Sequence, residues 1–345
     1  MRIAVYTIAK NEEPFVQRWA DSCADADYRF IVDTGSTDNT IGAANKAGVH
    51  IAVIRVDPWR FDHARNHALN ALPKDIDMCI ALDMDEVLQP GWREALETVP
   101  NGTTRPRYKY VWSWNNDGSE GLVYGGDKIH ARHNYRWKHP VHEILQPVDI
   151  LEQQHWVAGL EIHHYPDTSK SRGQYFDLLK LAVEEEPDDP RNQFYLGREY
   201  FYRGDHDNAR RHLITTTLIQ SWPPERAAAY RMLYRMSGRE HDLYWALMAD
   251  PHRRENLVLM AEHYYRLQDW ETCRMWAKAA TDITVKPLDY LCDPEAWGWL
   301  PWDLWAVSAW NTGRKDEAYR AGRMALELNP SDPRLVANME WYSQR

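Results

Sequence analysis

The chain has 345 residues, enough for two domains that each bury a core of their own. Its formal net charge of −10 argues against a surface that coats nucleic acid, although it allows a local basic groove. No apolar run approaches the ~20 residues that span a bilayer, and the chain starts with a strand-like run instead of a charged leader. The four cysteines are scattered, so we expect a soluble protein of the reducing cytoplasm.

The first half of the chain alternates between strand-like and helix-like stretches. Buried strands are predicted at residues 2–9, 28–32, 50–56 and 78–82, and amphipathic helices that end near residues 23, 47 and 72 follow the first three of them. This alternation predicts an α/β domain with a parallel sheet that helices cover on both faces. Residues 107–114 then alternate as a half-exposed strand does.

The acidic stretch after the fourth predicted strand is the strongest chemical signal. Asp83, Asp85 and Glu86 directly follow a run of apolar residues. In open α/β sheets, ligands bind at the carboxyl ends of the strands. Two carboxylates one residue apart repel each other there unless a cation lies between them, and Mg²⁺ or Mn²⁺ takes such oxygen ligands together with substrate phosphates. The sequence therefore predicts a metal–diphosphate site, although Asp-x-Asp alone is more often a solvated acidic turn.

The second half of the chain, after Pro166, has a helical pattern with an internal repeat. The spacing of residues 197–209 recurs at 231–243, a shift of 34 residues, and in two later units. The first position of this frame is taken by Gly197, Arg231, Ala261 and Ala306. A unit of ~34 residues is the tetratricopeptide period, and stacked helix pairs of this kind form a curved solenoid with one concave face.

Four segments of the first half carry a family resemblance. They are Val5–Glu13, Val32–Thr40, Ala64–Asn66 and Leu82–Glu86. In this order they resemble the family 2 glycosyltransferases of GT-A fold, and the trailing repeats resemble those of one subgroup of that family. The resemblance implies a GT-A type, Rossmann-like nucleotide-sugar domain at residues 1–166 and an all-α, tetratricopeptide-like helical solenoid at residues 167–345. In that family the fold binds a nucleotide-activated sugar, most often a UDP-sugar, and transfers the sugar with inversion.

The resemblance also implies which residues contact the nucleotide. These are Tyr6, Thr7, Ala9, Asp33, Arg65 and Asp83. The segment Tyr6 to Ala9 would hold the nucleobase, Asp33 would contact base or ribose, and Asp83 would meet the ribose or a metal-bound water. Two of these residues have a plainer interpretation, because Asp33 could simply cap the following helix and Arg65 could be a surface arginine.

The metal and the proton acceptor are expected at other positions. Asp85 would ligate Mn²⁺ or Mg²⁺ directly, and His142 or His164 could complete the metal shell. The family's His-Tyr-Gly-Tyr pattern reads His164-Tyr-Pro-Asp here, and a single histidine more often bonds a buried carbonyl. Inverting transfer needs a base for the acceptor's proton, and we expect Glu143 in this role, with Asp127 as the alternative.

The leading hypothesis is a cytoplasmic, metal-dependent, inverting glycosyltransferase whose repeats help to select the acceptor. The alternative is a repeat scaffold that binds a partner and carries an inactive transferase domain, against which the acids at positions 83, 85, 86 and 143 argue. A protein or peptide, a glycan and a modified base in DNA all remain open as acceptors. The sequence identifies neither the sugar nor the oligomeric state.

Overall fold

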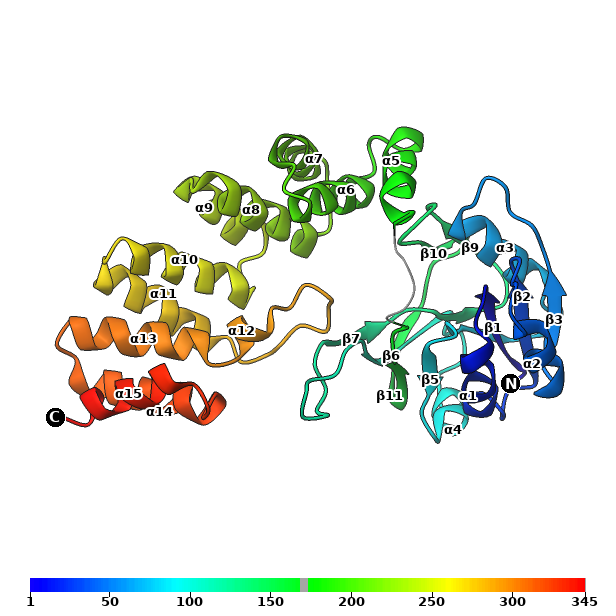
Figure 1. The fold of residues 1–345 in the computed structure, drawn as a ribbon, viewed down its shortest axis with the longest axis horizontal. Helices are drawn as coiled ribbons and strands as arrows, with labels where there is room; N and C mark the ends of the chain where they lie inside the picture. Colours follow the sequence, from blue (N-terminus) through cyan, green and yellow to red (C-terminus); the bar gives the residue numbers. More distant parts are fainter. Residues whose placement is uncertain (168–172, 345) are drawn as a thin grey trace. The chain divides into compact units, whose positions relative to one another are not determined.

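The computed structural model describes residues 1–167 and 173–344. They fall into two compact units, Met1–Ala182 and Val183–Arg345. The first unit is α/β and the second consists of helices, as the sequence predicts (Figure 1). The helix α5 (Tyr175–Glu185) begins in the first unit, C-terminal to the division expected at residues 166 and 167. No helix of the described residues is long and apolar enough to span a membrane.

The central sheet of the first unit has the strand order β3-β2-β1-β4-β8. Its strands are β1 (Ile3–Ala9), β2 (Tyr28–Asp33), β3 (His50–Val53), β4 (Met78–Ala81) and β8 (Ile129–Ala131). The first four are parallel, which confirms the predicted parallel sheet, and β8 runs antiparallel to β4. The carboxyl ends of β1, β2 and β4 therefore meet at one edge of the sheet.

Both faces of this sheet are covered, because its side chains alternate between two cores. Along β1, Ile3 and Val5 join one hydrophobic cluster, while Ala4 and Tyr6 join the other. The helices α1 (Glu13–Ser22) and α2 (Thr40–Lys46) cover the first face, and α3 (Phe61–Ala71) covers the second.

Trp19 ties α1 to the end of β4. Its side chain is fully buried, and its indole N–H donates to the carbonyl oxygen of Leu82 at 2.9 Å. Loss of a buried tryptophan typically costs about 3–5 kcal/mol. This contact therefore holds the start of the acidic stretch in place.

A second sheet, of order β5-β11-β6-β7, brings a histidine to the acidic stretch. Its strands are β5 (Glu86–Leu88), β6 (Arg105–Val111), β7 (Val123–Gly126) and β11 (Gln154–His164). The strand β11 pairs antiparallel with β5, and this register sets His164 opposite Glu86. Only glycine fits at position 126 of β7, since a Cβ there would lie 2.2 Å from the ring of Tyr108. The helix α4 (Trp92–Glu97) follows β5, and β9 (Tyr135–Lys138) pairs with β10 (Ile144–Pro147).

The second unit is built from consecutive helices that pack in pairs (Figure 1). After α5 come α6 (Pro190–Tyr202), α7 (His206–Leu218), α8 (Pro223–Ser237), α9 (Glu240–Ala249), α10 (Arg254–Arg266), α11 (Trp270–Asp282), α12 (Pro294–Trp297), α13 (Leu300–Asn311), α14 (Lys315–Leu328) and α15 (Pro333–Tyr342). The pairs α6–α7, α8–α9, α10–α11 and α13–α14 match the four units of the sequence repeat. This agreement confirms the helical repeat architecture.

Aspartate side chains cap several of these helices at their N-termini. Asp189 accepts hydrogen bonds from the backbone N–H groups of Arg191 and Asn192 and so caps α6, and Asp205 and Asp269 cap α7 and α11 in the same way. A small residue is needed where paired helices approach closely: a Cβ on Gly197 would lie 2.9 Å from the side chain of Leu213.

Candidate functional site

The acidic stretch turns back on itself immediately after β4. Glu86 accepts a hydrogen bond from the backbone N–H of Asp83 at 2.8 Å and another from the hydroxyl of Tyr110 at 2.5 Å. Its side chain is only 1% exposed, and burial raises its pKa. Glu86 is therefore a structural residue that closes the turn and leaves Asp83 and Asp85 to face the edge of the sheet.

Asp83 lies between two cations. Its carboxylate accepts from Arg65 of α3 at 2.7 Å and from Lys128 at 2.6 Å. Burial alone would raise the pKa of Asp83, but Arg65 and Lys128 hold it well below its usual range. Asp83 is thus an ionised carboxylate in a fixed orientation.

Arg65 joins Asp83 to Glu143. Its guanidinium contacts both carboxylates and lies over the ring of Trp137, 4.9 Å from the ring centroid. The side chain of Arg65 is 8% exposed, and its Nη1 has no hydrogen-bond partner among the described residues. Nη1 of this buried guanidinium therefore lacks the hydrogen-bond partner that such groups normally have.

Lys128 is a member of the site that the sequence does not reveal. It immediately precedes β8, and its carbonyl oxygen accepts from the backbone N–H of Ala81 at 3.0 Å. Its ammonium lies 2.6 Å from both Asp83 and Glu86. The antiparallel pairing of β8 with β4 brings Lys128 next to these acids. No local pattern in the sequence predicts that pairing.

Asp85 and His164 form a second pair at the same edge. His164 Nε2 lies 3.2 Å from a carboxylate oxygen of Asp85, and its Nδ1 lies 2.8 Å from the carbonyl oxygen of Trp112. The imidazole stacks on Trp112 with the ring centroids 4.3 Å apart. Since a carbonyl oxygen only accepts, Nδ1 carries a proton, and Nε2 is the nitrogen that faces Asp85.

The pKa of His164 reflects this environment. Burial alone would lower the pKa, but the hydrogen bonds to Asp85 and to the Trp112 carbonyl raise it above its ordinary value of 6.5. A neutral Nε2 and an ionised carboxylate would present lone pairs to each other. Either a second proton or a cation must therefore lie between them, and a histidine held this way is a typical metal ligand.

The residues expected to hold the nucleotide at β1 and β2 are largely engaged within the protein. The hydroxyl of Tyr6 accepts from the indole of Trp137 at 2.8 Å and contacts His130 at 3.0 Å in the core. Thr7 is buried, and its hydroxyl donates to the carbonyl of Ile8. Ala9 accepts from the backbone N–H of Thr34. The side chains of Tyr6 and Thr7 are therefore buried and engaged within the protein.

Asp33 closes its own loop. Its carboxylate accepts from the backbone N–H groups of Gly35 and Ser36, both at 3.0 Å, and from the Ser36 hydroxyl. Gly35 has a φ of 106°, which only glycine adopts without strain. The side chain therefore has a structural role, which resembles the expected capping role, although it caps the loop and not the helix α2.

Asp127 and His142, the two remaining candidate site residues, contact other parts of the first unit. Asp127 is exposed, and its backbone carbonyl accepts from Arg105 at 2.6 Å. The ring of His142 faces Tyr175, with centroids 6.2 Å apart. The structure thus joins Arg65, Asp83 and Glu143 directly and pairs Asp85 with His164, whereas the contacts described for Asp127 and His142 are with other residues.

Comparison with known proteins finds solved structures that are similar to parts of the chain. Glucosyl-3-phosphoglycerate synthase from Mycobacterium tuberculosis, solved with Mn²⁺, uridine diphosphate and glucosyl-3-phosphoglycerate, is 23% identical, with a TM-score of 0.28, and the match covers 32% of this chain and 44% of that one. The chain therefore spans less than half the length of that enzyme. MamA is 14% identical, with a TM-score of 0.38, and the match covers 48% of this chain and 96% of MamA.

A thermophilic TPR protein in Thermus thermophilus, TTC0263, is 20% identical, with a TM-score of 0.32, and the match covers 49% of this chain and 89% of that protein. No curated protein matches the chain. The model of the family "Glycosyl transferase family 2" matches residues 4–98, which contain β1 to β4 and the acidic stretch. The part of the chain that carries the acidic stretch is therefore similar in sequence to glycosyl transferase family 2.

Proposed function

We propose that the protein transfers a sugar from a nucleotide-sugar, with UDP as the nucleotide, to an acceptor with inversion and with the help of Mn²⁺ or Mg²⁺. The family match of residues 4–98 supports glycosyl transfer. The observation that carries the proposal is the pairing of Asp85 with His164 at the carboxyl end of β4. One carboxylate oxygen and one imidazole nitrogen, 3.2 Å apart, are ligands that Mn²⁺ accepts.

In this proposal Asp85 and His164 hold the cation. A divalent cation there would neutralise the charge that develops on the diphosphate as it leaves. The hydrogen bond from His164 Nδ1 to the Trp112 carbonyl keeps Nε2 directed at the site. Asp83, held by Arg65 and Lys128, accepts a ribose hydroxyl, and the two cations balance the added negative charge of the nucleotide. His142 is the alternative metal ligand.

The transfer breaks the bond between the sugar's anomeric carbon and the diphosphate oxygen, and forms a bond from that carbon to the acceptor oxygen. The acceptor's proton needs a base, and we assign this role to Glu143. Its contact with Arg65, which also contacts Asp83, holds the Glu143 carboxylate at the edge of the site. The helical repeats would help to select the acceptor, for which a protein, a peptide or a glycan is preferred over a DNA base.

The choice between the two candidate bases can be tested directly. Glu143→Gln should lower the rate of transfer to an acceptor by about 100-fold or more, because a general base typically contributes 10²–10⁴-fold. Asp127→Asn should leave the rate within about 3-fold, since the Asp127 side chain is exposed. Initial rates of transfer at saturating donor would check this, and the opposite ranking of the two variants would assign the base to Asp127.

The pH dependence of metal binding tests the role of His164. The cation must displace the Nε2 proton, so the affinity for Mn²⁺ should fall as the pH drops through the raised pKa of His164 and should level off above it. Calorimetric titrations with Mn²⁺ from about pH 5.5 to about pH 8.5 would measure this. His164→Gln should bind Mn²⁺ more weakly and with a flatter pH profile. An affinity for Mn²⁺ that does not change with pH in the unsubstituted protein would contradict the assignment.

The proposed function itself is tested by donor hydrolysis. Purified protein incubated with Mn²⁺ and a panel of UDP-, GDP- and TDP-sugars should release nucleoside diphosphate slowly from the UDP-sugars. Chelation of the metal should stop this release. The alternative, a repeat scaffold with an inactive transferase domain, predicts no release and no binding of any nucleotide in calorimetry.

A further inference from the structure

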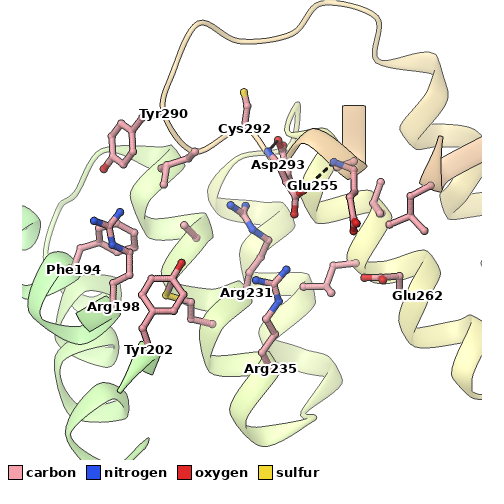
Figure 2. A pocket seen from close by; sticks show the side chains of 18 residues that line it. Phe194, Arg198, Tyr202, Arg231, Arg235, Glu255, Glu262, Tyr290, Cys292 and Asp293 are labelled. Carbon is pink, nitrogen blue, oxygen red and sulfur yellow. Dashed lines mark hydrogen bonds between the residues drawn. The ribbon is translucent and has the colours of Figure 1, made fainter. Parts of the chain in front are cut away.

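A cavity of about 280 Å³ lies within the helical unit, among residues that the proposed transfer does not use. Its walls come from α6, α8, α10 and the segment that leads into α12 (Figure 2). Arg198, Arg231 and Arg235 extend from the α6 and α8 side, as Figure 2 shows, while Glu255 and Glu262 belong to α10. The cavity therefore has an arginine-bearing wall and a carboxylate-bearing wall.

Arg231 is the unusual residue of this cavity. It is only 8% exposed, and its guanidinium donates to the neutral side chain of Asn256 at 2.7 Å. Within the described parts of the chain it forms no ion pair, and burial lowers its pKa to about 10. A buried arginine is normally paired with a carboxylate, so Arg231 could bind an anionic ligand.

The sequence repeat gives an independent reason to look for a ligand. Arg231 occupies the repeat position at which the other units have Gly197, Ala261 and Ala306. A small residue at this position is compatible with the packing of a helix pair in three of the four units. Packing within the repeat therefore does not require the long, charged side chain of Arg231.

The carboxylates of the opposite wall form no ion pair with Arg231 among the described residues, and one oxygen of Glu255 already has two other donors. Oε1 of Glu255 accepts from the backbone N–H of Asp293 at 2.9 Å and from the indole of Trp297 at 2.8 Å. The Asp293 side chain caps α12. Burial raises the pKa of Glu262 and so favours its neutral form.

Glu255 also has an acceptor atom that lacks a donor. Its Oε2 is buried and accepts no hydrogen bond from the described residues, and it lies 3.9 Å from Nη1 of Arg253. The Glu255 side chain as a whole is 4% exposed. Buried carboxylate oxygens are nearly always hydrogen-bonded, so this atom points to a missing N–H or O–H donor.

We propose that this cavity binds a small anionic group, a carboxylate or a phosphate, whose carrier also has an N–H or O–H donor. The anion binds Arg231, with Arg198 and Arg235 on the same wall, and the donor binds Oε2 of Glu255. The volume lies just below the roughly 300–1,000 Å³ typical of ligand sites, so the cavity suits one acidic residue or a phosphate monoester and is too small for a nucleotide-sugar. This site does not depend on the proposed transfer reaction.

Calorimetry on the whole chain at low salt tests the proposal with two probes, inorganic phosphate and N-acetylglutamate amide. At least one should bind, and N-acetyl-lysine amide should not. Tighter binding of the glutamate derivative would identify an acidic peptide segment as the natural source of the anion, whereas tighter binding of phosphate would identify a phosphorylated small molecule.

Matched variants locate the binding. Arg231→Gln should weaken the binding of the better probe by about 10-fold or more, as expected for a lost hydrogen bond between charged groups. Arg235→Gln changes an exposed side chain, so it tests the same wall without risk to the fold, and should weaken binding by about 3-fold or more. Arg323→Gln, which removes an arginine paired with Glu327 on α14, should have no effect. Absence of binding by both probes at millimolar concentration, or unchanged binding in both the Arg231 and Arg235 variants, would overturn the proposal.

Discussion

Replacement of Asp85 by asparagine should lower the Mn²⁺-dependent release of UDP from a UDP-sugar by about 100-fold or more. Asparagine keeps the shape of the side chain and removes its negative charge, so the pair with His164 can no longer hold a divalent cation firmly. Loss of even an outer-shell partner of a metal typically costs 10- to 100-fold in affinity or activity. Release of UDP, measured with a coupled assay at saturating Mn²⁺, would show the effect.

The fold should survive this substitution, because the Asp85 side chain is 30% exposed. Asp25→Asn is a suitable control, since Asp25 is an exposed carboxylate of the same unit that lies outside the site. Both variants should keep the circular dichroism spectrum of the unsubstituted protein. Equal rates of UDP release for the Asp85 variant and the control would show that Asp85 is not a metal ligand.

Replacement of Arg65 by methionine should destabilise the first unit by about 3–5 kcal/mol, the usual cost of removing one partner from a buried ion pair. Arg65 is the cation shared by Asp83 and Glu143, and both contacts are largely shielded from solvent. Without it, two partly buried carboxylates would lose the cation that they share, and only Lys128 would remain beside Asp83. Hydrogen exchange of peptides from β1 and β4, which measures the free energy of opening locally, would detect the loss.

A surface pair provides the control for this prediction. Arg55 and Asp57 lie 3.3 Å apart with side chains 88% and 72% exposed, so Arg55→Met should cost less than about 1 kcal/mol. Arg65→Lys should be intermediate, because an ammonium cannot offer the planar fork that reaches both carboxylates. Unchanged protection of β1 and β4 in the Arg65→Met protein would show that the ion pairs contribute nothing to stability.

The central sheet was predictable because its signals are local. The apolar run before Asp83 ends in acids, and the runs of β1 and β2 end in polar loops, so their positions along the chain follow from residue order alone. The third strand is shorter than predicted: it ends at Val53, while the apolar pattern continues to residue 56. Strand pairing, and not hydrophobicity, decides where it stops.

The site is only partly visible in the sequence, because its partners come from distant strands. The sequence offers both His142 and His164 as candidates, and only the register of β11 against β5 sets His164 beside the acids. Lys128 escaped notice for the same reason, since it reaches Asp83 through the pairing of β8 with β4. Arg65 and Glu143 were each chosen for a separate role, yet their contact could not be read from residues so far apart in the chain.

Pulsed electron paramagnetic resonance of bound Mn²⁺ would test the central claim, that Asp85 and His164 together hold the metal. With Mn²⁺ and UDP present, the spectrum should contain the ¹⁴N coupling of one directly bound imidazole. This coupling should disappear in His164→Gln and persist in His142→Gln. A bound Mn²⁺ without nitrogen coupling, or a coupling that survives in His164→Gln, would contradict the account.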